Sequence, residues 1–264
     1  VKFIAWRIDQ GDEPADAIRA LMREIKGAYS CVFTTRRELY LFRDPLSMRP
    51  MVWGKTSNGT VVVASESCAL DILQVNGRQE VPPAGIIRVN KDGISLLEND
   101  PNLYRSRRHN SYCVFEHIYF SRPDSYHFGE NVFAVREKIG ELLAKDDEGL
   151  QADCVVPVPD SSNLMAVGYS AASGVPLSLG LIRNHYIGRT FIKPQQTIRD
   201  EGVYQKFNPL PNFYKGKKVV LVDDSIVRGT TIRQIVRMIK EAGAEEIHLR
   251  IGSPQVKFSC YFGI

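Results

Sequence analysis

The sequence predicts two regions of different fold class: an α+β region over residues 1–105 and an α/β region with a mostly parallel sheet over residues 106–264. Three observations support this division. Strand-like segments follow one another in the first hundred residues, helical segments alternate with short apolar strands after about residue 110, and the stretch between has no apolar periodicity. Alternating helices and strands are typical of parallel sheets covered by helices on both faces.

The first region begins with an amphipathic helix and continues with strands. Residues 16–26 carry four apolar side chains at helical spacing, and Gly27 follows the last of them. These side chains are Ile18, Leu21, Met22 and Ile25. The next four segments are rich in β-branched and aromatic residues, and the first two flank a polar turn, which predicts a hairpin. They are residues 28–33, 38–42, 60–64 and 85–89.

Residues 98–110 are the predicted linker. They contain Asn-Asp-Pro and the basic cluster 105–109, and they show no helical or strand period. We interpret the basic cluster as a solvated connection and not as a surface for nucleic acid.

The second region alternates helices and strands. Apolar stripes predict helices over residues 132–143 and 232–239. Nearly all-apolar segments predict buried strands at residues 154–158, 219–222 and 247–251. Ligands of such sheets gather at the carboxyl ends of the strands.

Composition narrows the class of protein. The chain has 264 residues, of which 44% are hydrophobic and 24% charged, as in ordinary globular proteins. A net charge of +4, evenly spread, argues against a general nucleic-acid-binding face but allows a pocket for one anionic ligand. The sequence shows neither an apolar run of about 20 residues nor a signal peptide, so we expect no membrane partner and a cytoplasmic location. Five scattered cysteines indicate reduced thiols, without a disulfide framework or a zinc site.

Residues 219–231 are the most informative stretch. A buried strand delivers Asp223 and Asp224 to its carboxyl end, and a loop with hydroxyls and a glycine then enters a helix. Backbone N–H groups and a helix N-terminus suit a phosphate, and Gly229 lets the backbone approach it closely. The two carboxylates suit sugar hydroxyls or a metal bridging to a polyphosphate. The alternative is that Asp-Asp-Ser merely caps the helix.

This run of thirteen residues resembles the phosphoribosyl diphosphate (PRPP) signature of type I phosphoribosyltransferases. Four further motifs occur in the order and approximate spacing of amidophosphoribosyltransferase, the glutamine-PRPP enzyme family that opens purine biosynthesis. They are residues 119–125, 156–162, 184–192 and 206–209. Short motifs in the first hundred residues are similar to the latter part of that family's amino-terminal-nucleophile (Ntn) glutaminase domain. They are residues 27–29, 43–45, 49–50 and 64–67.

The resemblance implies a partial Ntn glutaminase domain at 1–105 and a type I phosphoribosyltransferase domain at 106–264. It implies formation of 5-phosphoribosylamine from PRPP and glutamine-derived ammonia, the first step of de novo purine (IMP) biosynthesis. Mg²⁺ would be held by Ser161, Asp223 and Asp224, and residues 184–194 would form a loop that closes over PRPP. The implied PRPP-binding residues are Asp160, Ser161, Ser162, Arg189, Asp223, Asp224, Ser225, Val227, Arg228, Gly229, Thr230 and Thr231. His185 replaces an arginine common in that loop.

The glutaminase half departs from the family pattern. The family uses an amino-terminal cysteine as nucleophile, whereas Val1 stands at the start and Cys31 lies inside a predicted strand without a free α-amino group. No catalytic residue is therefore assigned, and we expect activity with ammonia at most. Either a fragment cut at both ends or a degenerate paralogue fits this pattern.

Two cysteines resemble ligands of an iron–sulfur cluster. Cys113, before a predicted strand at 120–125, and Cys260 stand where cluster-bearing relatives place two of four thiolates, so this chain alone cannot complete a [4Fe-4S] cluster. Two small apolar side chains at the edge of a core fit equally well.

The remaining expectations concern partners and rival functions. The family implies purine nucleotides as inhibitors, and we expect a homo-oligomer. Rival functions are a PRPP-sensing regulator, which would show a DNA-binding segment, and a transferase acting on a nucleobase, which the glutaminase-like first hundred residues argue against.

Overall fold

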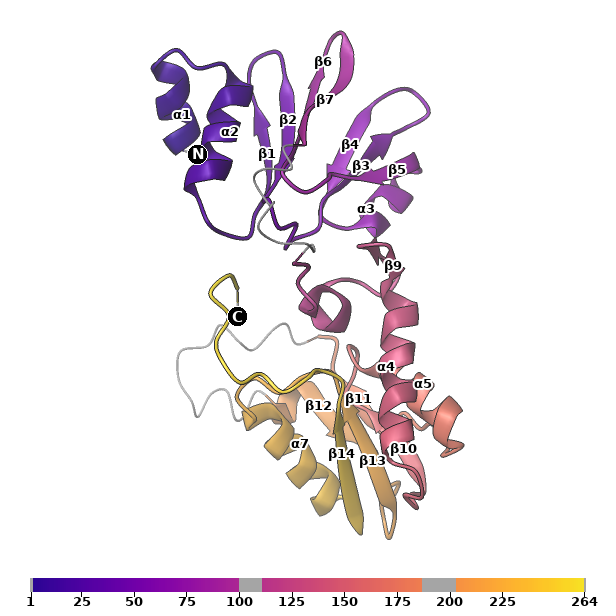
Figure 1. Cartoon of the computed structure of the whole chain (residues 1–264). Helices are drawn as coiled ribbons and strands as arrows, with labels where there is room; N and C mark the ends of the chain where they lie inside the picture. Colours follow the sequence, from indigo (N-terminus) through magenta and orange to yellow (C-terminus); the bar gives the residue numbers. More distant parts are fainter. Residues whose placement is uncertain (1, 100–110, 187–202, 264) are drawn as a thin grey trace. The chain divides into compact units, whose positions relative to one another are not determined.

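A computed structural model of the chain describes residues 2–99, 111–186 and 203–263 (Figure 1). The chain forms two compact units. The first consists of Val1–Glu116, Ser121–Asn131 and Lys257–Ile264, and the second of His117–Phe120 and Val132–Val256. No helix in the described ranges is long and apolar enough to cross a bilayer.

In its described residues, the first unit contains two larger antiparallel sheets, one two-stranded sheet and three α-helices. Its helices are α1 (Lys2–Asp9), α2 (Pro14–Glu24) and α3 (Ser67–Ile72). One sheet has the order β1 (Ser30–Thr34), β2 (Leu39–Arg43), β6 (Gly85–Asn90), β7 (Gly93–Asn99). The other has the order β4 (Val61–Ala64), β3 (Val52–Lys55), β5 (Asn76–Glu80), and β8 (Tyr126–His127) pairs with β9 (Glu130–Asn131).

Strand β2 is buried on both of its faces. Tyr40 and Phe42 pack with Ile18 of α2, whereas Leu41 points to the other side and packs with Ile87 of β6. Successive side chains of a strand alternate between faces, so a run of apolar residues is expected where both faces are covered.

The structure confirms the predicted hairpin and adjusts two boundaries. Helix α2 ends at Glu24, because Ile25 is extended and 43% exposed and so leaves the apolar stripe. The predicted linker starts too early, since Glu98 and Asn99 belong to β7 and pair with β6. Residues 100–110 lie outside the described residues.

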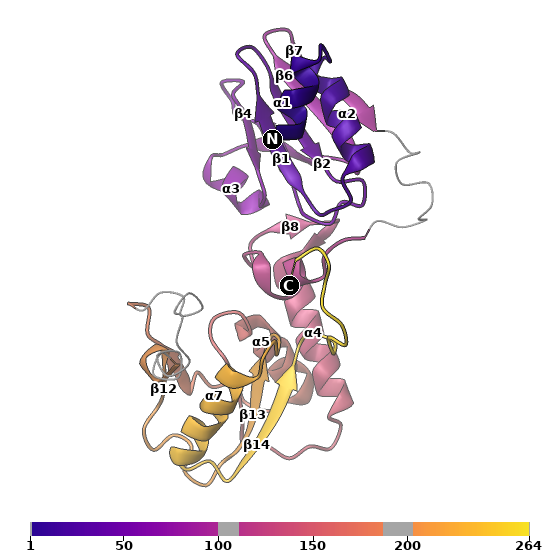
Figure 2. The same ribbon diagram turned by 90° about the vertical axis from the view of Figure 1, so that its left-hand side faces the viewer.

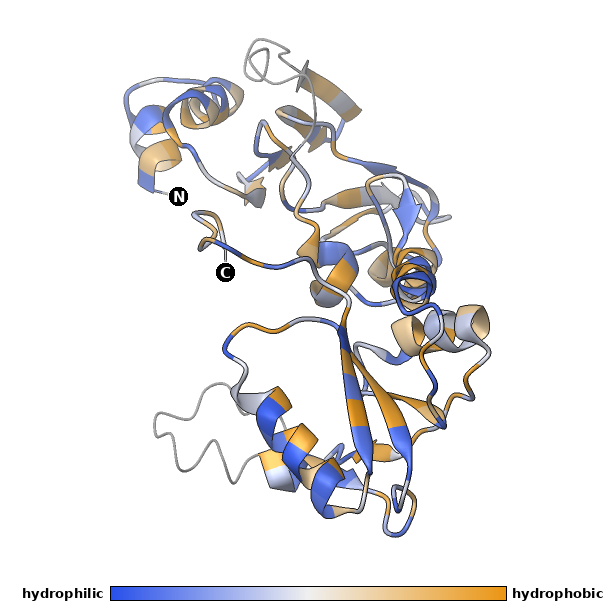
Figure 3. Cartoon of the chain, turned by 60° about the horizontal axis from the view of Figure 1, so that its bottom comes forward, coloured by the Kyte–Doolittle hydropathy of each residue, from blue (hydrophilic) through white to orange (hydrophobic). Residues whose placement is uncertain are grey.

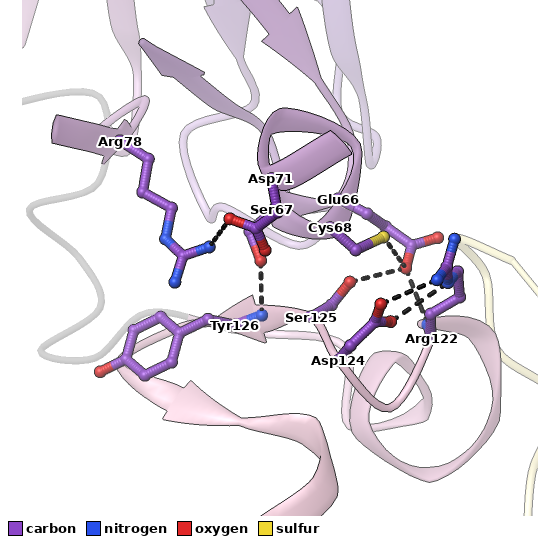
Figure 4. A network of polar contacts seen from close by, with 9 residues as sticks. All are labelled: Glu66, Ser67, Cys68, Asp71, Arg78, Arg122, Asp124, Ser125 and Tyr126. Atoms are coloured by element: carbon purple, nitrogen blue, oxygen red, sulfur yellow. Dashed lines mark hydrogen bonds and ion pairs between the residues drawn. The ribbon is translucent and has the colours of Figure 1, made fainter. Parts of the chain in front are cut away.

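The motif at residues 119–125 is a turn preceded by a helix, where a strand was predicted. Glu116–Phe120 form a short π-helix, η2, and the Ser125 N–H donates to Arg122 O (3.0 Å). Glu66 accepts the Arg122 N–H (2.7 Å) and the Ser125 hydroxyl (2.9 Å), while the Ser67 hydroxyl oxygen accepts the Tyr126 N–H (2.7 Å) (Figure 4). Side chains at the start of α3 therefore hold the turn, which a local sequence pattern cannot indicate.

The second unit contains the predicted parallel sheet. Its strands have the order β10 (Cys154–Pro157), β13 (Lys218–Asp223), β14 (Glu246–Ile251), and a separate antiparallel pair joins β11 (Leu181–Arg183) to β12 (Phe207–Pro209). Its helices are α4 (Val132–Asp146), α5 (Asn163–Ser173) and α7 (Thr230–Glu241).

Strand β13 is the centre of this unit. Leu221 packs with Ile235 of α7, and Val220 packs with Met165 and Tyr169 of α5 on the opposite face. Figures 1 and 2 show α7 on one side of the sheet and α4 with α5 on the other. Figure 3 shows long apolar stretches on the strands between helices of mixed polarity. This arrangement explains why β13 is apolar at successive positions.

Helices α4 and α5 pack backbone against backbone. A Cβ atom at Gly140 would lie 1.9 Å from Met165 O, and one at Gly168 would lie 2.0 Å from Glu137 O. Both positions therefore require glycine because of close approach. Helix α5 was not predicted, because its sequence of small and apolar residues has only a weak helical stripe.

Candidate functional site

Two loops meet at the carboxyl edge of the parallel sheet. Strands β10 and β13 are parallel neighbours, with Pro157 opposite Val222, so the loops that follow them leave the sheet on the same edge. The Val158 N–H donates to Val222 O (2.8 Å), which extends the pairing into the first loop. This pairing brings Ser161 from one loop to Asp224 of the other.

The acidic pair is buried and held by hydrogen bonds. Asp223 and Asp224 are 9% and 5% exposed. The carboxylate of Asp224 accepts hydrogen bonds from the Ser161 hydroxyl and from the Ser225 hydroxyl (2.5 Å from its Oδ1). The Asp224 N–H in turn donates to Asp223 Oδ1 (2.9 Å). These contacts fix both carboxylates in place at the strand end.

Burial changes the charge behaviour of the pair. Burial raises the pKa of Asp223 to about 7, and the charge of Asp224 adds to this rise. Burial also raises the pKa of Asp224, although the hydrogen bonds from the Ser161 and Ser225 hydroxyls oppose this rise. Desolvation disfavours the ionised forms, so the pair is suited to a cation that would compensate both charges.

The residues present fit Mg²⁺ that arrives with its ligand. Carboxylate and hydroxyl oxygens are hard donors, and Mg²⁺ commonly uses one or two carboxylates together with substrate phosphates and water. Within the described ranges, no group of three or more His, Cys, Asp or Glu residues could hold a metal by itself. The two acids and Ser161 would supply part of a coordination site, which a phosphorylated ligand would complete.

The start of α7 is the place where the sequence predicts an anion site. Gly229 has φ of +72° and immediately precedes Thr230, the first residue of the helix. A Cβ there would meet nothing closer than 3.7 Å, so the left-handed backbone, and not crowding, selects glycine. Val227 and Arg228 are exposed in the loop before it. Free N–H groups and the helix dipole favour an anion at this end.

In the first loop, residues 158–162 after β10, some side chains are exposed and others are buried. Its Pro159–Asp160 peptide bond is cis. Asp160 is exposed and forms an ion pair with Arg183 of β11. The Ser162 hydroxyl is fully buried and donates to Val158 O, so it stabilises the loop from inside. Arg189 lies outside the described residues.

Sequence reasoning missed two cations near the acidic pair. Arg136 is 2% exposed on α4, donates from Nε to His117 O (2.7 Å), and its charge opposes the burial-driven rise in the pKa of Asp224. Lys206, just before β12, acts in the same way on Asp223. A buried arginine within the apolar stripe of α4 was a usable signal, because charged residues are rarely buried without a partner. Lys206 offered no such signal.

The five cysteines are free and take different environments. Cys68 and Cys154 are buried, whereas Cys31 is only half-buried in β1, because that strand lies at the edge of its sheet. Burial raises the pKa of the Cys31 thiol. Cys113 and Cys260 both belong to the first unit, although they are far apart in sequence.

Comparison with known proteins finds a matching family model for part of each unit. The family model described as a phosphoribosyl transferase domain matches residues 129–251, and that described as a glutamine amidotransferase domain matches residues 11–72. The Arabidopsis thaliana protein "Amidophosphoribosyltransferase 1, chloroplastic" is 49% identical over 91% of this chain and 42% of its own length. The amidophosphoribosyltransferase of Bacillus subtilis is 43% identical over 94% of this chain and 51% of its own length.

Two solved structures have the same fold. The glutamine PRPP amidotransferase of B. subtilis, complexed with ADP and GMP, matches with a TM-score of 0.85 and 40% identity over 99% of this chain and 56% of that one. A structure described as the allosteric regulatory enzyme of purine biosynthesis matches with a TM-score of 0.79 and 37% identity over 99% of this chain and 59% of that one. The chain thus spans about half the length of the curated relatives it matches.

Proposed function

This chain belongs to the amidophosphoribosyltransferase family, and from that premise we propose that it performs the phosphoribosyl-transfer half of the family's reaction. In this proposal ammonia displaces pyrophosphate from PRPP and 5-phosphoribosylamine forms, as the first step of de novo purine biosynthesis. The observation that carries it is the contact of Ser161 with the buried Asp223–Asp224 pair beside the start of α7.

Each part of the site has a task in this reaction. Asp223 and Asp224 hold the ribose hydroxyls and, with Ser161, the metal. The loop from Ser225 to Thr231 holds the 5′-phosphate with its N–H groups, and residues 158–162 hold the pyrophosphate. When bound, Mg²⁺ supplies neutralisation of the charge that develops on the pyrophosphate.

The chemistry is electrostatic. The C–O bond to pyrophosphate breaks, positive charge builds on the anomeric carbon, and the nitrogen lone pair of ammonia forms the new C–N bond before the nitrogen loses a proton. N–H groups fixed at the loops stabilise the departing anion without reorganisation.

We propose that these 264 residues use ammonia and do not hydrolyse glutamine. In the complete protein, ammonia would come from glutamine. Among the five cysteines, all of which are described, the earliest is Cys31, and burial raises the pKa of its thiol. A catalytic thiol needs the opposite shift.

Further proposals concern the longer protein. Cys113 and Cys260 would contribute two thiolates to a [4Fe-4S] cluster, which their placement in one unit supports. Purine nucleotides would act as inhibitors, in line with the ADP and GMP complex of the B. subtilis relative. We also propose a homo-oligomer, a cytoplasmic location and domain limits at 1–105 and 106–264.

Titration calorimetry with PRPP and Mg²⁺ tests the site. Replacing both acids (Asp223→Asn, Asp224→Asn) removes two charged contacts, so we expect the affinity to fall by about 100-fold. The matched control is Glu246→Gln at the amino end of β14, on the opposite edge of the sheet, which should bind as wild type does. Equal affinity in the double variant would contradict the assignment of the two acids.

A further inference from the structure

A cavity of about 520 Å³ lies within the second unit, at the ends of α4 and α5. Its walls are the end of α4, residues 147–150 of the loop that follows, and the last turn of α5. This loop leads to the amino end of β10, so the cavity is at the amino edge of the sheet, whereas the acidic pair follows β13 at the carboxyl edge. A volume of this size is ordinary for a small-molecule site.

The carboxylate of Asp147, which lines the cavity, is nearly buried and held in place. Its side chain is 10% exposed. Its Oδ2 accepts hydrogen bonds from the Tyr169 hydroxyl (2.6 Å) and from Arg250 Nε. Arg250 itself is fixed, because its Nη1 donates to Leu249 O (2.8 Å). The other oxygen, Oδ1, accepts no hydrogen bond from any residue that the structure describes. One oxygen of an oriented carboxylate is therefore available to a ligand.

The surroundings of this carboxylate favour a cation. Burial alone would raise the pKa of Asp147, but the hydrogen bonds from Arg250 and Tyr169 outweigh it and lower the pKa, so the group is ionised at neutral pH. The carboxyl ends of α4 and α5 carry partial negative charge on their last carbonyls. Glu148 adds a carboxylate at the solvent side, and the exposed Lys145 can extend its ammonium into water.

The lining suits an organic cation better than a bare metal ion. In the ranges covered by the structure, no group of three or more His, Cys, Asp or Glu residues could hold a metal. The cavity also presents apolar surface from Leu150, Ala172 and the ring of Tyr169, which would contact methylene groups. A primary ammonium has three N–H donors, enough for a carboxylate oxygen and helix-end carbonyls together.

We propose that this cavity binds a small organic cation with a primary ammonium group, such as an alkyl diamine. The ammonium donates to Asp147 Oδ1, Glu148 interacts with its charge, and the alkyl chain packs on Leu150 and Ala172. Tyr169 and Arg250 hold the carboxylate in the orientation that leaves Oδ1 available. The site lies apart from the acidic pair, so the inference does not rest on phosphoribosyl transfer.

Titration calorimetry with putrescine (1,4-diaminobutane) tests this proposal. We expect saturable binding of one molecule per chain. The matched probe is 1,4-butanediol, which has the same carbon chain but no charge, and we expect no saturable binding of it. Asp147→Asn removes the charge but also leaves Arg250 without its carboxylate partner, which can destabilise the fold. Two other variants therefore carry the test.

The first variant fills the cavity and the second removes a charge from its wall. Ala172→Leu should weaken putrescine binding by about tenfold or more, because the larger side chain occupies the cavity. Glu148→Gln should weaken it by about threefold, as expected for an exposed charge. The matched controls are Ala171→Leu on the same helix and Asp146→Asn beside Asp147. Neither residue lines the cavity, so both controls should bind as wild type does.

Three outcomes would overturn the proposal. The first is the absence of saturable putrescine binding to the wild-type chain. The second is equal affinity for putrescine and 1,4-butanediol, which would mean that charge is not recognised. The third is wild-type affinity in Ala172→Leu when circular dichroism shows that this variant is folded. PRPP binding at the other edge of the sheet is measured separately, so failure here leaves the proposed function standing.

Discussion

At the scale of single residues, the buried acid Asp223 connects stability to function. Its folded-state pKa is raised from 3.8 to about 7, so between these values the folded protein binds more protons than the unfolded chain. The free energy of unfolding therefore falls as pH rises through this window and stays reduced above it. The buried carboxylate of Asp223 therefore lowers the free energy of unfolding of the ligand-free protein at neutral pH and above.

Replacing this acid by its amide should stabilise the ligand-free chain. Asp223→Asn keeps an oxygen that accepts the Asp224 N–H but removes the charge. We expect Tm to rise by roughly 5 °C at pH 8, with little change at pH 4, where wild-type Asp223 is largely protonated. Calorimetric scans at both values measure this, and a variant that melts below wild type at pH 8 would contradict it.

The two serines of the first loop should respond differently to removal of their hydroxyls. Ser161→Ala loses the contact with Asp224, so PRPP affinity should fall about tenfold, and Tm should fall less than in Ser162→Ala because the Ser225 hydroxyl still donates to Asp224. Ser162→Ala leaves Val158 O without its buried donor, which should cost about 1–2 kcal/mol of unfolding free energy. Calorimetric titration and urea unfolding distinguish them; equal effects on binding would refute this division of tasks.

Sequence reasoning could predict the local part of the candidate site but not its tertiary part. Asp223, Asp224 and Gly229 lie in one continuous stretch, so their chemistry could be inferred from spacing. The contact of Ser161 with Asp224 joins residues 63 positions apart, and it was anticipated only through the family resemblance. Arg136 is noticeable in the sequence because it lies within the apolar stripe of α4, but its place near Asp224, like that of Lys206 near Asp223, depends on how α4 and β12 pack.

At the scale of elements, the helices and strands that could be predicted are those whose apolar residues recur at a regular spacing. Strand β13 and helix α7 were found because their buried faces are marked by regular apolar residues. Strand β5, with the sequence Asn-Gly-Arg-Gln-Glu, is almost wholly exposed and has no such mark. It forms because β3 provides a partner edge, so pairing alone determines it.

The close packing of α4 on α5 gives a prediction at this scale. In Gly140→Ala the new methyl would overlap Met165 O at 1.9 Å, so the two helices must separate. We expect a loss of about 3 kcal/mol or more in unfolding free energy. The control is Gly27→Ala, where the nearest atom would lie 3.9 Å away. Urea unfolding measures both, and equal stabilities would mean that the helices can move apart without loss.

At the scale of the whole molecule, the separation of the two half-reactions can be measured. We expect pyrophosphate release from PRPP with ammonia as nitrogen donor and no glutamate formation from glutamine, because the chain carries the proposed transfer site and burial raises the pKa of the Cys31 thiol, unlike that of a catalytic thiol. A coupled pyrophosphate assay and glutamate analysis on the same sample test this. Asp223→Asn combined with Asp224→Asn serves as the inactive control. PRPP binding without pyrophosphate release would support the regulator instead.

The path of the chain between the two units has a consequence for biosynthesis. Residues 257–263 complete the first unit but are synthesised after almost the whole of the second. A domain emerging from the ribosome usually begins to fold before the next has been translated. Here the contacts of residues 257–263 with the rest of the first unit can form only when translation of this stretch is over. A nascent chain stalled before residue 257 should therefore hold the sheets of the first unit while the surface that these last residues contact remains open to solvent.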